Sequence, residues 1–270
     1  MMASTEHRPW PLPASPWTGS MVWSDLLFAH WPVDVDALRA IMPVTLPPET
    51  YDRRAWLTIS PLYMSEVRPR GVPSVPRLSE FPELNVRTYV SLEGKPGIYF
   101  FSLDAGSLLA VAGARAAFHL PYFLASMSIS HEAGYVHFTS HRSRWHGSEA
   151  HFVARYRPTR DVFHAAPGSL DEWLTERYCL YAIDSGGRLY RAEIHHARWP
   201  LQPAEAQLFR NTMTGPLGVR IPDTAPLLHY CQRLPVVSWM PARVEPAAPP
   251  PAIIPPAGEV PPSSPENERR

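Results

Sequence analysis

Arginine and tyrosine side chains inside apolar segments are the residues of this sequence that could do chemistry. Arg87 and Tyr89 are two residues apart in an alternating segment, so both would lie on one face of a strand. The next apolar segment ends at Asp104, and Arg115 interrupts an otherwise apolar stretch. Arginine offers a bidentate fork for a carboxylate, so these groups would bind an anionic small molecule if they converge in a cavity. The alternative is that Arg87, Asp104 and Arg115 form structural ion pairs.

Two further segments contribute candidates. Arg177 ends a predicted helix, and His196 adjoins His195 in a predicted strand, where the two would point to opposite faces. No catalytic residue is assigned. The candidate ligand-binding residues from these segments are Arg115, Arg87, Asp104, Tyr89, Arg177 and His196.

The sequence has no G-x-G-x-x-G after a strand, no phosphate-binding loop, no G-x-S-x-G and no H-E-x-x-H. Its 12 histidines raise the question of a metal. His137 and His141, four apart on a predicted strand, would lie about 13 Å apart, too far to share an ion. His195 or His196 could combine with a histidine of another strand, but no spacing requires it. We predict no metal and no cofactor.

Composition excludes several classes of partner. The 25 basic and 25 acidic residues cancel, so no field for nucleic acid is expected. The longest apolar run, Ala105–Ala114, is about half as long as a membrane-spanning helix, which needs roughly twenty apolar residues. The two cysteines fit reduced thiols, and no signal peptide is recognisable at the start of the sequence, so we expect a cytoplasmic protein. A small-molecule ligand is the expected partner, and a homo-oligomer is compatible with the sequence.

Prolines divide the chain into three parts. Residues 246–270 are dense in proline and should form a disordered tail. Residues 1–19 should form a flexible segment, although Trp10 and Trp17 could dock on the surface. The remaining residues, 20–245, contain no linker and are expected to form a single domain.

Strand signals dominate the central part. Two hairpins are expected, around the turns 93–97 and 184–188. Helices are expected after the N-cap Asp34, within Ala105–Phe118, after the capping box Ser169/Glu172, and over Gln202–Met213. Separate strands are expected over Leu227–Gln232 and Val236–Met240. Hairpins without strict βαβ alternation predict an α+β fold, a β-rich antiparallel barrel-like sheet with a few peripheral helices.

Several runs resemble the YqjF-like family of uncharacterised proteins, in the expected order over residues 21–244. They are residues 85–90 (NVRTYV), 97–105 (GIYFFSLDA), 114–122, 174–181 and 194–201. This family is grouped with the acetoacetate decarboxylase-like superfamily. The resemblance implies a barrel-like α+β fold that encloses a small-molecule cavity.

The superfamily's named chemistry needs a lysine amine that forms an imine with a keto acid. The resemblance places Tyr122 where that lysine would stand, and tyrosine cannot form an imine. The chain has one lysine, Lys95, in a Gly-Lys-Pro-Gly turn, where a solvated amine is mostly protonated at pH 7. Tyr122 would be either a hydrogen-bond donor in the cavity or a buried residue that fills the space.

Two functional hypotheses follow. The first is a small-molecule-binding barrel for a carboxylate or keto acid, which could be an enzyme without an imine step. The second is a non-catalytic regulatory or protein-interaction module that uses the proline-rich tail. Residual decarboxylation through Lys95 is a third, minor hypothesis.

Overall fold

The computed structural model describes residues 4–76 and 79–245. In these ranges the chain forms thirteen strands, three α-helices and two short 3-10 helices. The strands are β1 (Gly19–Val33), β2 (Ala55–Pro69), β3 (Phe81–Leu92), β4 (Lys95–Ala105), β5 (Tyr122–Leu124), β6 (Ser126–Glu132), β7 (Tyr135–Arg142), β8 (Ala150–Pro158), β9 (Cys179–Ile183), β10 (Leu189–His195), β11 (Gln202–Asn211), β12 (Leu227–Ser238) and β13 (Ala242–Arg243). The helices are α1 (Val35–Ile41), α2 (Leu108–Phe118), α3 (Leu170–Thr175), η1 (Arg144–His146) and η2 (Gly215–Leu217). None of the helices in the described ranges could cross a membrane by length and apolarity.

Seven strands pair with one another in a circular order, which we call the ring. The expected β-rich α+β fold is thereby confirmed. β1, β2, β3 and β4 pair in sequence order and antiparallel. β4 pairs with β9 in parallel, while β9 pairs with β10 and β1 with β12 antiparallel. β10 and β12 then pair at only two positions, Ile194 with Ser238 and His195 with Val237. Because the β10–β12 contact is this short, the sheet is barrel-like in outline but is not a closed barrel.

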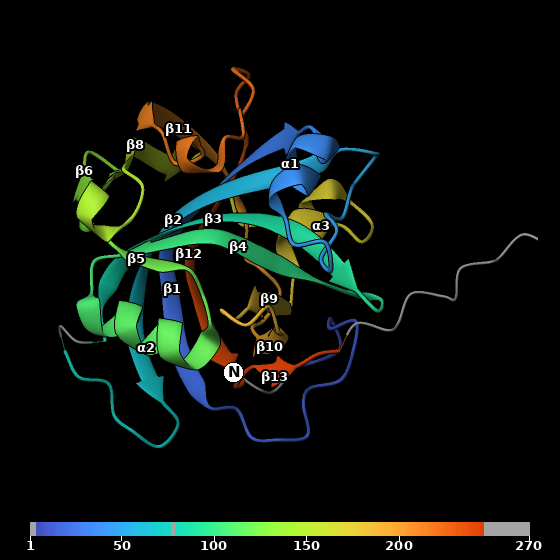
Figure 1. Cartoon of the computed structure of the whole chain (residues 1–270). Helices are drawn as coiled ribbons and strands as arrows, with labels where there is room; N and C mark the ends of the chain where they lie inside the picture. Colours follow the sequence, from blue (N-terminus) through green and yellow to red (C-terminus); the bar gives the residue numbers. More distant parts are fainter. Residues whose placement is uncertain (1–3, 77–78, 246–270) are drawn as a thin grey trace, which may run out of the picture.

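A second, four-stranded layer extends from β12. β11, β8, β7 and β6 pair antiparallel in that order, and β11 joins β12 through Gln202 and Pro203. Figure 1 shows this layer at the upper left, beside the ring strands β2, β3 and β4, with α2 below β4. Phe138 and Phe152 of the layer share a hydrophobic core with Val86 of β3, so the layer covers the outer face of the ring.

Alternation along β3 separates the two faces of the ring. Leu84, Val86 and Val90 join the outer core, where β7 and β8 also pack. The odd-numbered residues point the other way, because successive side chains of a strand alternate. Phe28 of β1 and Trp199 belong to the second core, which lies inside the ring. The residues of β3 on this inner face are Glu83, Asn85, Arg87 and Tyr89.

Two helices begin where the sequence predicts. The Asp34 Oδ1 atom accepts a hydrogen bond of 2.8 Å from the Ala37 N–H, which starts α1. The Ser169 Oγ atom accepts from the Glu172 N–H at 3.2 Å, which starts α3. Both are caps that satisfy an otherwise unpaired N–H of the first turn.

The helix expected over Gln202–Met213 is wrong, because this segment forms strand β11. Ala204, Ala206 and Leu208 pack against the outer core, while the intervening Glu205 and Gln207 lie in the opposite direction. This period of two is the pattern of a half-buried strand. The two strands expected at the end of the domain are one continuous strand, β12, in which Pro235 pairs with Val22.

Residues 4–18 lie against β10 and β12. Arg8 is buried, and the indole of Trp239 donates to the Ser15 carbonyl at 2.7 Å. The Trp10 indole donates to Glu193 at 2.7 Å, as the expected docking of this tryptophan requires. The mobility expected of residues 1–19 and the single-domain boundaries stay predictions. The proline-rich tail, 246–270, lies outside the described residues.

Candidate ligand-binding site

A row of polar side chains follows β3 along the interior of the ring. Register places Thr58 of β2 opposite Arg87, and Ser60 opposite Asn85. Opposed residues of paired strands point to the same face, so these four side chains line one surface. All four are buried. Buried polar groups normally form hydrogen bonds with one another, with water or with a ligand.

Arg87 stands out in this row because its charge has no carboxylate partner. Its residue is 8% exposed, and no ion pair to it occurs among the described residues. The Nε and Nη2 atoms have no hydrogen-bond partner, and the guanidinium lies 4.8 Å from the centre of the Phe28 ring. Burial lowers the pKa of Arg87, although an arginine keeps its proton in proteins. A buried cation with free donors is costly unless an anion meets it.

Hydroxyl and imidazole groups surround this guanidinium. The Thr58 Oγ1 atom lies 2.7 Å from the Tyr89 hydroxyl and 2.8 Å from the His30 Nδ1 atom. The ring of His229 lies 5.5 Å from that of His30. Burial, reinforced by His229 and Arg87, holds the pKa of His30 well below its usual range. His30 is therefore neutral, with one nitrogen able to accept a hydrogen bond.

The other end of the row carries a carboxyl group. The Tyr122 hydroxyl donates to the Glu83 Oε2 atom at 2.8 Å, and Asn85 also bonds to this carboxyl group. Burial raises the pKa of Glu83 to about 7, and these two hydrogen bonds oppose the rise. Burial and the neighbouring Glu83 raise the pKa of Tyr122 well above its usual range. At neutral pH, Glu83 can therefore donate or accept a proton.

Several interior atoms have no hydrogen-bond partner within the described structure. Many of these atoms lie on the inner face of the ring, while others, such as Asp104 Oδ2, Ser140 Oγ and Asn211 Nδ2, lie elsewhere. The atoms on the inner face include Ser60 Oγ, Asn85 Oδ1, Arg87 Nε and Nη2, His30 Nε2, His229 Nδ1 and Trp199 Nε1. Donors and acceptors of this kind can bind a small polar molecule that carries a negative charge.

Helix α3 covers one end of the ring. Its Trp173 ring lies 4.6 Å from that of Tyr89, and Asp171 lies 3.0 Å from the His229 Nε2 atom. Arg177, just after the helix, lies 5.1 Å from the centre of the Tyr89 ring. Its Nη1 atom is 2.5 Å from Glu49, so Arg177 is near the site but already ion-paired.

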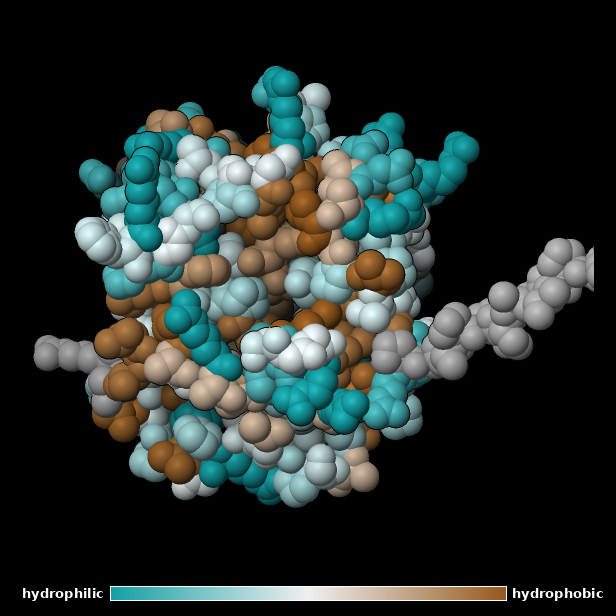
Figure 2. Space-filling model, viewed as in Figure 1, coloured by the Kyte–Doolittle hydropathy of each residue, from teal (hydrophilic) through white to brown (hydrophobic). Residues whose placement is uncertain are grey.

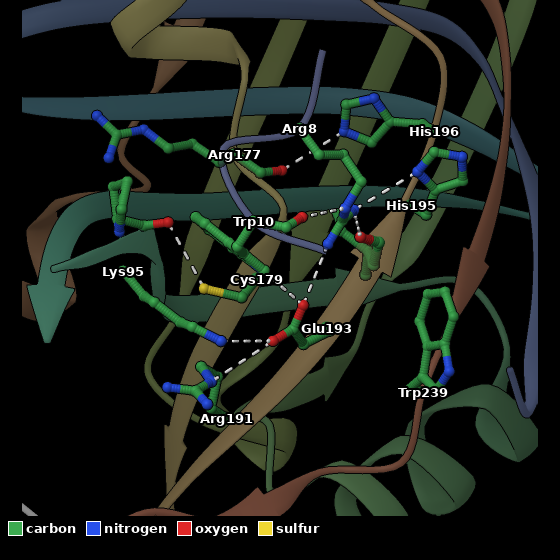
Figure 3. Close-up of polar contacts among 12 residues, drawn as sticks. Arg8, Trp10, Lys95, Arg177, Cys179, Arg191, Glu193, His195, His196 and Trp239 are labelled. Atoms are coloured by element: carbon green, nitrogen blue, oxygen red, sulfur yellow. Dashed lines mark hydrogen bonds and ion pairs between the residues drawn. The ribbon is translucent and has the colours of Figure 1, made fainter. Parts of the chain in front are cut away.

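His196 belongs to an aromatic wall on the other side. Its ring stacks on Tyr178 at 4.8 Å and meets Trp199 edge-on at 5.1 Å, and Trp199 in turn meets Phe28. Burial lowers the pKa of His196 to about 4, so the imidazole is neutral. In Figure 3 the His196 ring faces the Arg177 carbonyl, while the Arg177 guanidinium points away. His196 shapes the interior, and within the described structure its ring nitrogens face the Ala197 and Arg177 carbonyls and not Arg87.

Two of the predicted residues do not line the interior. Asp104 is opposite Leu84 of β3 and so faces the outer core, where it pairs with Arg142 at 2.9 Å. Arg115 is exposed on α2, and its Nε atom donates to the Tyr122 carbonyl at 2.7 Å. Arg87 and Tyr89 therefore lie close together on the inner face, and Tyr122 lies at the other end of the row beside Glu83, whereas Asp104 and Arg115 lie elsewhere. The structural ion pairs expected among Arg87, Asp104 and Arg115 do not form either.

Lys95 is also outside the ring. Its ammonium lies 3.3 Å from the Glu193 carboxylate, which also binds Arg8 at 3.1 Å and the Trp10 indole (Figure 3). An ion-paired ammonium is no nucleophile, because its lone pair carries a proton. This geometry argues against an imine at Lys95.

A groove reaches the sheet beside the site. β4 pairs with β9 at Ile98 and Tyr99 and then with β5 from Leu103 onward, so the sheet splits between these points. The groove at this split has a volume of about 270 Å³, and Phe100 is one of its lining residues. Figure 2 shows a hollow near the centre of this face. Phe100, which lines the groove, is also the β4 partner of Arg87.

Sequence reasoning missed several interior residues. Glu83 and Asn85 continue the alternation of Arg87 and Tyr89, so that pattern could have identified them. His30 and His229 lie on separate strands about two hundred residues apart in the sequence, and only the β1–β12 pairing brings them together.

Comparison with known proteins places this architecture. A family model described as "Uncharacterized conserved protein (COG2071)", DUF2071, matches residues 20–235. The chain belongs to the DUF2071 family. The uncharacterized protein YqjF of Bacillus subtilis (strain 168) is 47% identical over 228 residues, which cover 84% of this chain and 93% of YqjF. The YqjF-like resemblance of the sequence is thereby confirmed.

Solved structures show which folds resemble that of this DUF2071 protein. The enduracididine biosynthesis enzyme MppR, complexed with pyruvate, has a TM-score of 0.61 at 12% identity, covering 87% of this chain and 93% of MppR. Acetoacetate decarboxylase from Legionella pneumophila has a TM-score of 0.57 at 15% identity, covering 90% and 94%. The DUF2071 chain thus has an acetoacetate decarboxylase-like fold, as predicted.

Proposed function

We propose that this protein binds a small anionic molecule, of carboxylate or keto-acid type, inside the ring, with Arg87 as the anion-binding group. The observation that carries the proposal is the buried Arg87 guanidinium, with two nitrogen atoms unpartnered and no carboxylate beside it. A carboxylate would accept two parallel hydrogen bonds from such a fork. It would also supply the counter-charge that the described residues do not.

The neighbouring groups favour a ligand with a second polar function. Ser60 and Asn85, the next inward positions toward Glu83, have unpartnered oxygen atoms. A hydroxyl or hydrated carbonyl two or three bonds from the carboxylate would lie within reach of them. The Phe28 and Trp199 rings would contact the apolar part of the ligand. This set suits a short oxo or hydroxy acid better than a fatty acid.

Glu83 gives the site a group that could transfer a proton. It is buried, with a pKa of about 7, and the Tyr122 hydroxyl fixes one of its oxygen atoms. A carboxyl group poised near neutrality suits proton transfer next to a carbonyl group. The proposed chemistry is therefore acid–base chemistry without an imine, since Lys95 is held outside the ring by Glu193.

The fold relatives support the ligand class. MppR, with a similar fold, is known complexed with pyruvate, and acetoacetate decarboxylases share the architecture. The groove beside Phe100 offers the ligand a route to Arg87 through a movement of one side chain. We place this activity in the cytoplasm.

Binding of 2-oxo and 3-oxo acids tests the proposal. Pyruvate, acetoacetate and their neutral methyl esters would be titrated into the wild type, Arg87→Met and the matched surface variant Arg115→Met. We expect an acid to stabilise the wild type and Arg115→Met, by about 2.7 kcal/mol at a hundred times its dissociation constant. The esters and Arg87→Met should show no stabilisation. The proposal would be overturned if no acid of such a panel stabilised the wild type, or if an acid stabilised Arg87→Met as much as the wild type.

The alternative of a non-catalytic regulatory or protein-interaction module stays a prediction. Binding at Arg87 without turnover of the ligand would support a regulatory role, whereas turnover would support an enzyme. A homo-oligomer likewise stays a prediction.

A further inference from the structure

We propose that His141, Glu149 and His151 form a binding site for a divalent cation of the Zn²⁺ class on the outer face of the four-stranded layer. Each of the three side chains offers one ligand atom, and these atoms all lie within 4.8 Å of one another. The site is remote from Arg87, because it faces away from the ring.

Strand pairing brings the two histidines together. His141 of β7 and His151 of β8 are opposite each other in the antiparallel register. Their rings stack at 4.2 Å with an angle of 12° between their planes. The connecting loop returns Glu149 to the same edge, two residues before His151. His137, on the same strand, is opposite Arg155 and has no histidine partner, which explains why spacing along one strand did not reveal the site.

The distances approach those of a coordination sphere. The Glu149 Oε1 atom lies 3.1 Å from the His151 Nε2 atom and 4.0 Å from the His141 Nε2 atom. Ligand atoms bonded at 2.0–2.1 Å in tetrahedral geometry lie about 3.3 Å apart. The His141 side chain is 48% exposed, so its rotation could close the longer distance.

The donor types define the cation. Two imidazole nitrogens and one carboxylate oxygen suit Zn²⁺, and also Cu²⁺ and Ni²⁺, better than Ca²⁺ or Mg²⁺, which prefer oxygen alone. Three protein ligands on an open surface leave room for water as a fourth ligand.

The surroundings both support and oppose the site. The His151 backbone is fixed by Thr212, whose Oγ1 accepts from the His151 N–H at 2.8 Å. Arg144 lies 2.9 Å from the second oxygen of Glu149 and would repel a cation. Arg144 is 86% exposed, so it can move away when a cation binds.

Calorimetric titration of the tag-free full chain with ZnCl₂ tests the proposal. We expect one saturable site in the wild type and in the control His137→Ala. His141→Ala and Glu149→Gln should each lower the affinity at least tenfold. Arg144→Gln should raise the affinity, by about fivefold, because the competing cation is removed. A purely structural ion-pair cluster would not gain affinity in this variant.

Electron paramagnetic resonance of bound Cu²⁺ provides a second readout. Two imidazole nitrogens should appear in the wild-type spectrum and one in His141→Ala. The proposal is overturned if the wild type shows no saturable binding below 1 mM, or if His141→Ala and His137→Ala bind equally well.

Discussion

Replacing Arg87 with methionine should stabilise the protein without ligand while abolishing ligand binding. The methionine side chain fills a similar volume and removes a buried cation that no carboxylate neutralises. Replacement of even a paired set of buried charges by apolar residues is often neutral or stabilising, by up to about 1–4 kcal/mol. Because the cation–π contacts of Arg87 with the Phe28 and Tyr89 rings are lost in this variant, we expect a smaller gain of about 1–2 kcal/mol. At about 2–4 °C per kcal/mol for a chain of this size, Tm should rise by about 2–8 °C.

Paired thermal and chemical denaturation at pH 7 measures this effect. Arg115→Met, at an exposed position, should stay within about 0.5 kcal/mol of the wild type. A stabilised but non-binding Arg87→Met would show that the guanidinium is kept for a ligand and not for the fold. If Arg87→Met instead loses several kcal/mol, the guanidinium is a structural group, and our reasoning about an interior anion site fails.

Three further predictions concern the other charged groups. The pKa of Glu83 is raised from 4.5 to about 7 on folding, so its contribution to the free energy of unfolding is complete below pH 4.5 and is lost as the pH rises to 7. Urea unfolding at stepped pH should show that the wild type loses about 3 kcal/mol more stability than Glu83→Gln across this range. Equal pH profiles would contradict this. Glu193→Gln should lower the free energy of unfolding by about 3 kcal/mol, because Arg8 then stays buried without a carboxylate. Glu205→Gln, in an exposed ion pair, should lower it by less than about 1 kcal/mol. Similar losses in the two variants would refute this difference between a buried and an exposed ion pair. Borohydride with acetoacetate should leave the protein mass unchanged, and an adduct on Lys95 would disprove our exclusion of an imine.

Local chemistry in the sequence was sufficient to predict several elements. The caps at Asp34 and Ser169 predict two helix starts because a side-chain oxygen must accept the first free N–H groups. The spacing of Arg87 and Tyr89 predicts a shared face because side chains alternate along a strand. The fold class followed from the hairpins and the family resemblance.

Which face of the sheet a residue occupies could not be predicted in the same way. Phe101 is an extra residue between the partners of Val86 and Arg87, so β4 changes phase relative to β3. This bulge lets Phe100 face inward beside Arg87, while Asp104 faces outward to Arg142. No local pattern marks such a shift, because it depends on pairing between strands. The pairing of His141 with His151 was hidden for the same reason.

The charges near the interior explain why an anion, and not a neutral molecule, is the expected ligand. Arg177 is neutralised by Glu49. The Cα atoms of Arg87 and Glu83, four residues apart on β3, are separated by about 13 Å. No ion pair joins these two side chains among the described residues, and Glu83 is bonded to Tyr122 and Asn85 instead. Glu83 near pH 7 is also partly protonated and supplies less than a full negative charge. Arg87 is therefore left as the uncompensated charge of the described interior, and a carboxylate bound there would neutralise it.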